Sequence, residues 1–216
     1  MEMKIKRYIV IALLGMFFPL QLLAQDVAVF FTSMPLDLMP SVEKNRRKDL
    51  IDLYNDNRTA VIQNSFNTGV RIQKMTDDYI LMQSDRNSFE IILLSLINES
   101  KMICTIQTVC APVCDSKISF YTTDWKPLDA SNFITIADAS SFVKDDIELD
   151  DEAFLAAKAA LDMDLMELHI NPQDQTLIQT YNTPSYLSED AYQKIQPYLK
   201  EEPKVYHWNK LQFKQH

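Results

Sequence analysis

Two cysteines lie close together near the middle of the chain, in the segment TVCAPVCDS at 108–116. Outside the cytoplasm, thiols at such a spacing often pair, and Pro112 between them favours a bend that brings the sulfurs together. Redox pairs are usually C-x-x-C next to a helix, whereas this pair is C-x-x-x-C after an expected strand. We therefore predict a structural disulfide between Cys110 and Cys114 that pins the exit of the strand.

The third cysteine, Cys104, shares a face of the expected strand 101–109 with Met102 and Ile106, which predicts a buried free thiol. Six residues of extended strand separate Cys104 from Cys110 by about 20 Å, far beyond the reach of a disulfide. A bond from Cys104 to Cys114 remains an alternative if the chain folds back on itself.

Acidic side chains supply the second set of candidates for chemistry. Asp77, Asp78, Asp124 and Glu167 lie near expected strand ends or turns. Paired carboxylates with separated pKa values can perform acid–base catalysis on glycans, so a carboxylate-dependent hydrolase is the alternative function. His169 shares a strand face with Glu167, and we interpret these two as a solvent-facing polar pair. Because an acidic chain offers many such groups, we predict no catalytic residue.

The low glycine count excludes several common sites. The chain has two glycines, Gly15 and Gly69. A P-loop, a dinucleotide-binding fingerprint and a G-x-S-x-G elbow each need at least two within one motif. The histidines at 169, 207 and 216 are scattered and form no H-E-x-x-H, whereas zinc needs three or four converging ligands. We predict neither a cofactor nor a metal site.

The first 25 residues have the layout of a secretory signal peptide. Lys4, Lys6 and Arg7 precede the apolar stretch 9–23, and Ala24 supplies a small residue for cleavage. A spanning helix needs about 20 apolar residues, and this stretch is shorter. We predict residues 1–25 to be removed, with no membrane span afterwards and a periplasmic or cell-surface location.

The net charge narrows the choice of partners. The chain carries 21 Lys and Arg against 30 Asp and Glu, a formal net charge of −9, and removing residues 1–25 makes it more acidic. An acidic surface repels phosphate backbones and anionic lipid heads, which argues against nucleic acid and membrane surfaces. The partner we expect is an envelope protein, a peptide or a glycan.

The sequence of the N-terminal part predicts two short secondary-structure elements. Val27, Val29 and Phe31 alternate with other residues, which suggests a strand, and Ser41 opens an expected helix over 42–56. The basic run of this helix is interpreted as its solvated polar face: Lys44, Arg46, Arg47 and Lys48.

From residue 59 the periodicity becomes strand-like. Short breaks made by Asn, Asp, Ser and Thr favour hairpins, and hence an antiparallel meander. The expected strands are 59–66, 70–75, 79–83, 88–97, 101–109 and 117–122. The aromatic residues at 121, 125, 206 and 208 could form a sugar-stacking platform, although core packing is the commoner role.

The C-terminal part begins with the acidic stretch 144–152 and repeats the mixture of helices and strands. Helices are expected over 152–162 and over 189–199, the latter capped by Ser188. Strands are expected near 164–170, at 175–181 and at 204–213. We predict an α+β fold in which a few helices pack on antiparallel meander sheets. We expect two lobes, 26–143 and 144–216, packed together. Short sequence similarities suggest that the halves are related, and chance similarity between strands of like composition is an equally good explanation.

Several segments together resemble a family of exported proteins of unknown function from Bacteroidales bacteria. They are TVCAPVCDS, FYTTDWKPL at 120–128, RKDLIDLY at 47–54 and TPSYLS at 183–188. The resemblance implies a periplasmic or surface location and carries no activity. With no nucleophile motif and a well-patterned core, we expect a non-catalytic envelope protein that binds a protein, peptide or glycan.

Overall fold

The computed structural model describes residues 26–58, 61–148 and 150–215. The predicted signal peptide, residues 1–25, lies outside the described residues. The described chain contains four α-helices and two antiparallel sheets, of seven and four strands. The predicted α+β class with antiparallel meander sheets is therefore confirmed.

The first sheet is a continuous meander in which each strand pairs with the next along the chain. Its strands are β1 Ile62–Gln63, β2 Gly69–Met75, β3 Tyr79–Ser84, β4 Asn87–Ser95, β5 Lys101–Cys110, β6 Cys114–Tyr121 and β7 Pro127–Leu128. Residues 59 and 60 of the strand predicted over 59–66 lie outside the described residues. In the described part, the strand ends at Gln63, because Asn64 Oδ1 accepts hydrogen bonds from the amides of Phe66 and Thr68 and bends the chain. Both edges of the sheet are thus only two residues long, which limits pairing with other chains.

The strand predicted around Val27 and Phe31 is wrong. This segment is the helix α2 Val27–Ser33, capped by the Asp26 carboxylate on the amide of Ala28. Its buried residues, Val27, Phe30 and Phe31, recur at the three- and four-residue spacing of a helix.

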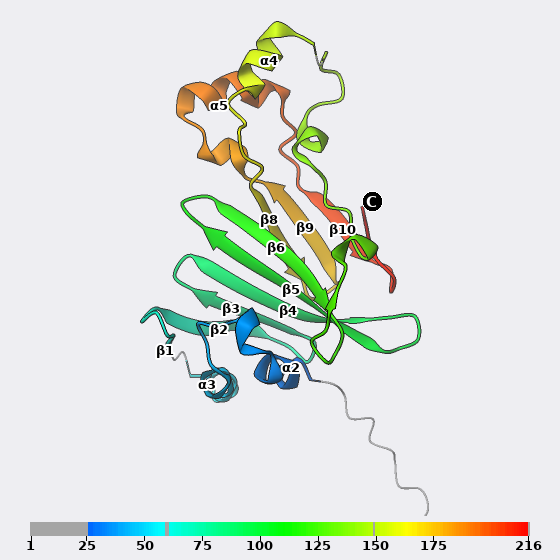
Figure 1. Cartoon of the computed structure of the whole chain (residues 1–216). Coiled ribbons are helices and arrows are strands. Elements are labelled where there is room, and N and C mark those ends of the chain that lie inside the picture. Colours follow the sequence, from blue (N-terminus) through cyan, green and yellow to red (C-terminus); the bar gives the residue numbers. More distant parts are fainter. Residues whose placement is uncertain (1–25, 59–60, 149, 216) are drawn as a thin grey trace, which may run out of the picture.

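The next helix, α3 Lys44–Asn55, confirms the helix predicted over 42–56, although its N-cap is Glu43 rather than Ser41. Helices α2 and α3 cover one face of the first sheet (Figure 1).

Strand β4 is buried on both sides, so it lies in the middle layer of the molecule. Phe89, Ile91 and Leu93 pack toward α2 and α3. Ile92 and Leu94 pack on the opposite face, against the second sheet. This explains the long apolar run of β4, which lacks the polar alternation of a half-exposed strand.

The second sheet has the order β11-β10-β9-β8. Its strands are β8 Met166–Asn171, β9 Thr176–Tyr181, β10 Lys204–Trp208 and β11 Phe213–Gln215. The last two replace the single strand predicted over 204–213. The reason is a turn at Asn209, whose Oδ1 accepts from the amides of Leu211 and Gln212 and reverses the chain.

Two short helices stand beyond the ends of β8 and β9 (Figure 1). They are α4 Glu152–Lys158, capped by Asp151, and α5 Glu189–Ile195, capped by Ser188 as predicted. Both are shorter than predicted. Phe154, Ala157, Ile195 and Leu199 form a small separate core between them, which we call the α4–α5 unit.

The two predicted lobes share a core, since residues of both sheets belong to one apolar cluster. The predicted boundary at 143/144 falls where Val143 forms a β-bridge with Leu199. Whether the halves are related units stays a prediction.

Candidate functional site

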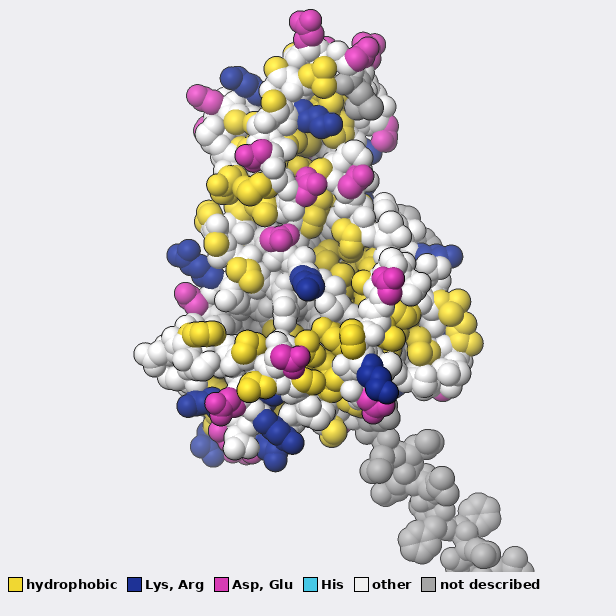
Figure 2. Space-filling view, viewed as in Figure 1, with side chains coloured by type: hydrophobic (Ala, Val, Ile, Leu, Met, Phe, Trp, Pro, Cys, Tyr) yellow, Lys and Arg dark blue, Asp and Glu magenta, His cyan; other side chains and the backbone are white. Residues whose placement is uncertain are grey.

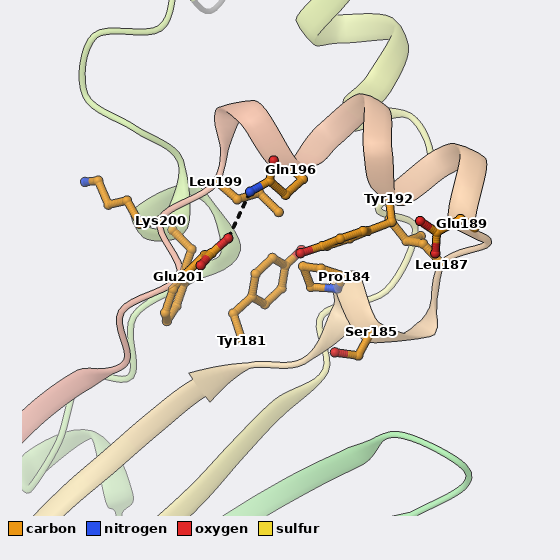
Figure 3. Close-up of a pocket in the computed structure, with 11 residues that line it drawn as sticks. Tyr181, Pro184, Ser185, Leu187, Glu189, Tyr192, Gln196, Leu199, Lys200 and Glu201 are labelled. Atoms are coloured by element: carbon orange, nitrogen blue, oxygen red, sulfur yellow. Dashed lines mark hydrogen bonds between the residues drawn. The ribbon is translucent and has the colours of Figure 1, made fainter.

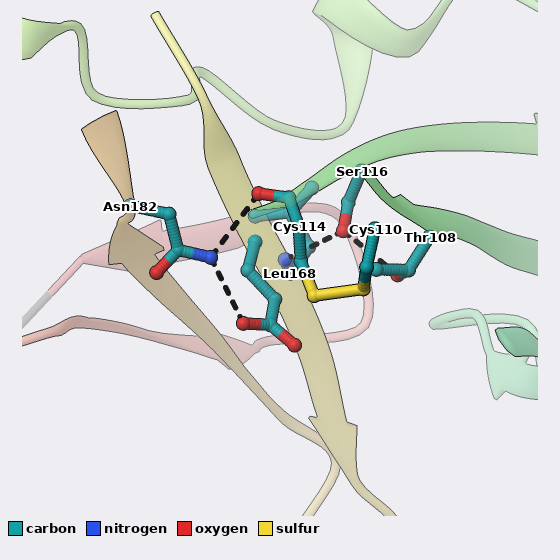
Figure 4. Close-up of a disulfide and its surroundings, with 7 residues drawn as sticks. Thr108, Cys110, Cys114, Ser116, Leu168 and Asn182 are labelled. Atoms are coloured by element: carbon teal, nitrogen blue, oxygen red, sulfur yellow. Dashed lines mark hydrogen bonds between the residues drawn. A yellow bond between two sulfur atoms is a disulfide. The ribbon is translucent and has the colours of Figure 1, made fainter. Parts of the chain in front are cut away.

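Cys110 and Cys114 flank the turn that connects β5 to β6. Cys110 and Cys114 are cross-strand partners joined by a disulfide, with Cα atoms 3.9 Å apart (Figure 4). Cys104 is a fully buried free thiol, and burial raises its pKa well above the usual value. A thiol held in its protonated form in the core is a poor nucleophile.

Hydrogen bonds next to the disulfide tie the two sheets together. The Ser116 hydroxyl bonds to Thr108 at 2.8 Å and accepts from the amide of Leu168 at 3.0 Å (Figure 4). Asn182 Nδ2 donates to the carbonyl of Cys114 and to the Glu167 carboxylate. These contacts indicate that the hairpin end holds the second sheet in place.

The edge strand β8 is docked on the first sheet by its backbone. Alternate β8 amides, which would otherwise be free at a sheet edge, each donate to a side chain of the first sheet. The pairs are Met166 N with Asp115 Oδ1 at 3.0 Å, Leu168 N with Ser116 Oγ at 3.0 Å, and Ile170 N with Glu90 Oε2 at 3.1 Å. We call this row of contacts the seam.

Glu90 is the most buried carboxylate of the seam, with 2% of its surface exposed. Besides the amide of Ile170, it accepts from the Tyr79 hydroxyl at 2.7 Å and bonds to His169 Nδ1 at 3.0 Å. Burial and the adjacent Glu90 raise the pKa of Tyr79 far above its ordinary value. The hydrogen bond to Glu90 raises the pKa of His169.

The carboxylate partner of His169 is therefore Glu90 and not Glu167, which corrects the predicted pair. The sequence did not point to Glu90, because it lies inside an apolar strand. Three of the four oxygen lone-pair directions of its carboxylate serve the fold, and Tyr79 is entirely buried. The arrangement positions the two sheets and leaves little capacity for a substrate.

The four carboxylates of the hydrolase hypothesis lie on three different elements. Asp77 and Asp78 occupy the β2–β3 turn, where Asp78 accepts from Thr76 Oγ1 and Gln175 Nε2. Asp124 is exposed in the β6–β7 turn, and Glu167 lies on β8. Only Asp77 and Asp78 share an element, so the structure does not gather the four carboxylates on one element.

The basic run of α3 does not form one polar face. Arg47 is 1% exposed and donates from Nη1 to the carbonyls of Phe31 and Met34 at 3.0 and 2.7 Å. These carbonyls end α2, where a cation is favourable. The prediction of a solvated face is wrong for this residue, while Lys44, Arg46 and Lys48 are exposed.

The aromatic residues weighed as a sugar platform are split between two cores. Trp125 packs on Tyr121 in the cluster beneath the helices. Tyr206 is 2% exposed, and Trp208 donates from Nε1 to the carbonyl of Ser95 in the cluster between the sheets. They hold the structure together and form no shared surface.

A cavity of about 350 Å³ lies between the end of β9 and α5, and we call it the α5 cavity (Figure 3). Its lining combines aromatic and apolar side chains with a few polar ones. The residues are Phe142, Tyr181, Pro184, Ser185, Leu187, Glu189, Tyr192, Gln196, Leu199, Lys200 and Glu201. Figure 2 shows apolar side chains reaching the surface among carboxylates at this end of the molecule.

Strand β9, a short turn and helix α5 position the residues that line the α5 cavity. Tyr181 ends β9, and Pro184 is the second residue of a short 3-10 helix, Thr183–Tyr186, that leads into α5. Helix α5 then presents Tyr192 toward Tyr181 (Figure 3).

One polar group of the α5 cavity has no partner within the described part of the chain. The Tyr181 hydroxyl is buried and makes no hydrogen bond there. The nearby Thr183 hydroxyl donates to Met163 O and accepts from Leu165 N. Burial raises the pKa of Tyr181 and the Thr183 hydroxyl lowers it by less, so the Tyr181 hydroxyl stays protonated and can both donate and accept.

The sequence analysis missed this cavity. None of Asp77, Asp78, Asp124 and Glu167 lines it. The available signal was the density of tyrosines at 181, 186 and 192 around Pro184, next to the acidic start of a helix. Aromatic and polar side chains that converge on a concave surface are typical of ligand sites.

Two general features of the described residues bear on the chemistry of the protein. No three His, Cys, Asp or Glu side chains among them are grouped so that they could hold a metal ion. In the same ranges, no helix has the length and apolarity needed to cross a bilayer.

The chain is an α+β protein with a layer of helices, a seven-stranded sheet and a four-stranded sheet. The profile of the family described as "Protein of unknown function (DUF3256)" matches residues 19–213, so the chain belongs to this family.

A solved domain of an uncharacterized protein from Porphyromonas gingivalis has the same fold. The two are 26% identical with a TM-score of 0.79, over 88% of this chain and 98% of that chain. Comparison with curated proteins finds no significant match.

Proposed function

We propose that the protein is a non-catalytic exported envelope protein that binds a protein, peptide or glycan in the α5 cavity. The observation that carries this proposal is the buried Tyr181 hydroxyl, which lacks a partner in a cavity lined by apolar and aromatic side chains. A buried polar group without a hydrogen bond costs about 1–3 kcal/mol, which a ligand that supplies the bond offsets.

Export is supported by the layout of residues 1–25 and by the disulfide, which is typical of oxidising compartments. The similar domain from Porphyromonas gingivalis supports an origin among the Bacteroidales and fits the predicted family of exported proteins. A periplasmic or cell-surface location follows from this proposal.

A glycan hydrolase is the second candidate. It ranks lower because its four carboxylates lie in separate turns and strands, outside the α5 cavity. A retaining or inverting mechanism needs two carboxyl groups facing one bond, within roughly 5–10 Å of each other.

The test uses peptide arrays and glycan arrays probed with the labelled protein. Two variants are compared: Ser185→Trp, which fills the α5 cavity from its rim, and Gln173→Trp, which adds the same side chain at an exposed turn outside it. We expect binding that Ser185→Trp abolishes and Gln173→Trp preserves. Binding that survives both substitutions, or no binding on either array, contradicts the proposal. Release of reducing ends from glycans would favour the hydrolase.

A further inference from the structure

The charged groups around the α5 cavity leave it with negative charge. Glu189 and Glu201 line it from two sides (Figure 3), and each accepts a hydrogen bond only from a neutral glutamine, Gln193 and Gln196 respectively. The single lining lysine, Lys200, is neutralised by Asp145 at 2.7 Å. Lys204, beside Phe142, is the other cation next to the cavity, and neither Glu189 nor Glu201 forms an ion pair with a described residue.

The aromatic rings of the cavity favour a cation over a sugar. The ring of Phe142 stacks on Tyr181 with centroids 5.3 Å apart, and Lys204 Nζ lies 5.3 Å from the Phe142 centroid. Phe142 thus has no free face on which a sugar could stack. The Lys204 contact also shows that this aromatic pair already accommodates an ammonium group.

We propose that the α5 cavity binds a basic side chain, lysine or arginine, presented by a peptide segment. The cationic group lies against Tyr181 and Tyr192, donates a hydrogen bond to the Tyr181 hydroxyl and pairs with Glu189 or Glu201. This inference rests on the proposed function and specifies the ligand of the same site. Desolvation of the cavity strengthens both the cation–π contact and the ion pair.

The experiment titrates the purified protein with three probes, followed by NMR chemical shifts and by isothermal calorimetry. The first is a capped glycine-rich peptide with an adjacent lysine and arginine. The second is the same peptide with norleucine and citrulline in their place, which keeps size and removes charge. The third is a neutral chito-oligosaccharide.

We expect only the basic peptide to bind, with shifts at Tyr181 and Tyr192 and an affinity that falls with added salt. The double variant Glu189→Gln/Glu201→Gln should weaken binding by about tenfold. The control Asp77→Asn/Asp124→Asn changes the net charge equally at exposed sites outside the cavity and should leave affinity within about twofold.

Each other outcome is decisive. If the neutral peptide or the oligosaccharide binds in the cavity as well as the basic peptide does, the inference is wrong and the proposed function stands. If the basic peptide binds but shifts only residues outside the cavity, the inference is also wrong. If no probe binds at millimolar concentration, the inference fails, and the arrays decide the proposed function separately.

Discussion

The seam and the α5 cavity both bury tyrosine hydroxyls, but they treat them in opposite ways. At the seam, Tyr79 donates to Glu90, and the same carboxylate also serves His169 and the amide of Ile170. In the cavity, the Tyr181 hydroxyl is buried without a hydrogen bond to any described residue. A polar group that the protein satisfies internally holds the fold, whereas one left unsatisfied in a hollow is available to a ligand.

The seam and the α5 cavity also differ in how rigid and how accessible they are. The seam joins β8 to the buried strand β4 and to β6, and the apolar cluster between the two sheets lies behind it, so opening the seam exposes core. The α5 cavity is lined by the end of β9, by the seven-residue helix α5 and by the short turns on either side of that helix, which pack on a small core apart from the two larger ones. Short elements with a small core open more easily than the strands of the sheets.

The largest expected effect comes from breaking the seam. Glu90→Ala leaves the Tyr79 hydroxyl and the amide of Ile170 without an acceptor inside the core, and it removes the partner of the half-exposed His169 ring. We expect a loss of about 3–5 kcal/mol in the free energy of unfolding, measured by urea denaturation. Asp77→Ala, at an exposed carboxylate, should change it by less than about 0.5 kcal/mol. Similar losses for the two variants contradict a structural seam.

On the opposite face of the first sheet, the packing of α2 should depend on Arg47. Arg47→Ala removes the donor for the two carbonyls at the end of α2 and empties its buried site, at a cost of about 2–4 kcal/mol. Lys48→Ala, one residue later and exposed, should cost under about 0.5 kcal/mol in the same assay. If both substitutions are neutral, Arg47 does not anchor α2.

The disulfide should contribute less to the free energy of unfolding than Glu90 or Arg47 does, because it closes only a short loop. For the double variant Cys110→Ser/Cys114→Ser, loop entropy predicts a loss of about 2 kcal/mol. Calorimetry of the wild type with and without reductant checks the same quantity. Mass spectrometry of unreduced peptides should find Cys110 joined to Cys114 and Cys104 free, and a Cys104 crosslink would show that the pairing is wrong.

A smaller, pH-dependent effect is expected from His169. Its pKa is raised by the hydrogen bond to Glu90, with Glu167 adding to the shift and burial and Lys74 opposing it. The protonated ring therefore stabilises the fold fully below the unfolded pKa of about 6.5, and this contribution disappears as pH rises through the higher folded pKa. The stability difference between wild type and His169→Gln should shrink between about pH 5.5 and pH 8.5. A difference that grows with pH contradicts the assignment.

Much of the fold could be predicted because its signals are local. The meander follows from strand-like runs separated by turn residues, and the structure confirms it. Helix α2, which the sequence analysis predicted as a strand, shows the limit of such signals. Val27, Phe30, Phe31 and Met34 fit a helical stripe, but a seven-residue apolar segment also fits a strand, and only packing on the first sheet decides between them.

The sites could not be predicted because their members are far apart in sequence. Glu90 and His169 are 79 residues apart, and a glutamate within the apolar run of β4 gives no hint of its partner. Arg47 resembles its solvated neighbours until α2 is folded against it. The α5 cavity joins Phe142 to residues 181–201, a proximity set by the β-bridge between Val143 and Leu199 and by the hydrogen bond from Lys200 N to Phe142 O.

The most direct test removes one oxygen atom from each of the two regions. Tyr79→Phe and Tyr181→Phe are the same chemical change, so the free energies of unfolding can be compared without correction for size. We expect Tyr79→Phe to lose about 1–2 kcal/mol, and Tyr181→Phe to lose nothing or to gain slightly while weakening peptide binding. Equal losses for the two variants, or unchanged binding by Tyr181→Phe, would contradict the distinction between a structural seam and a binding cavity.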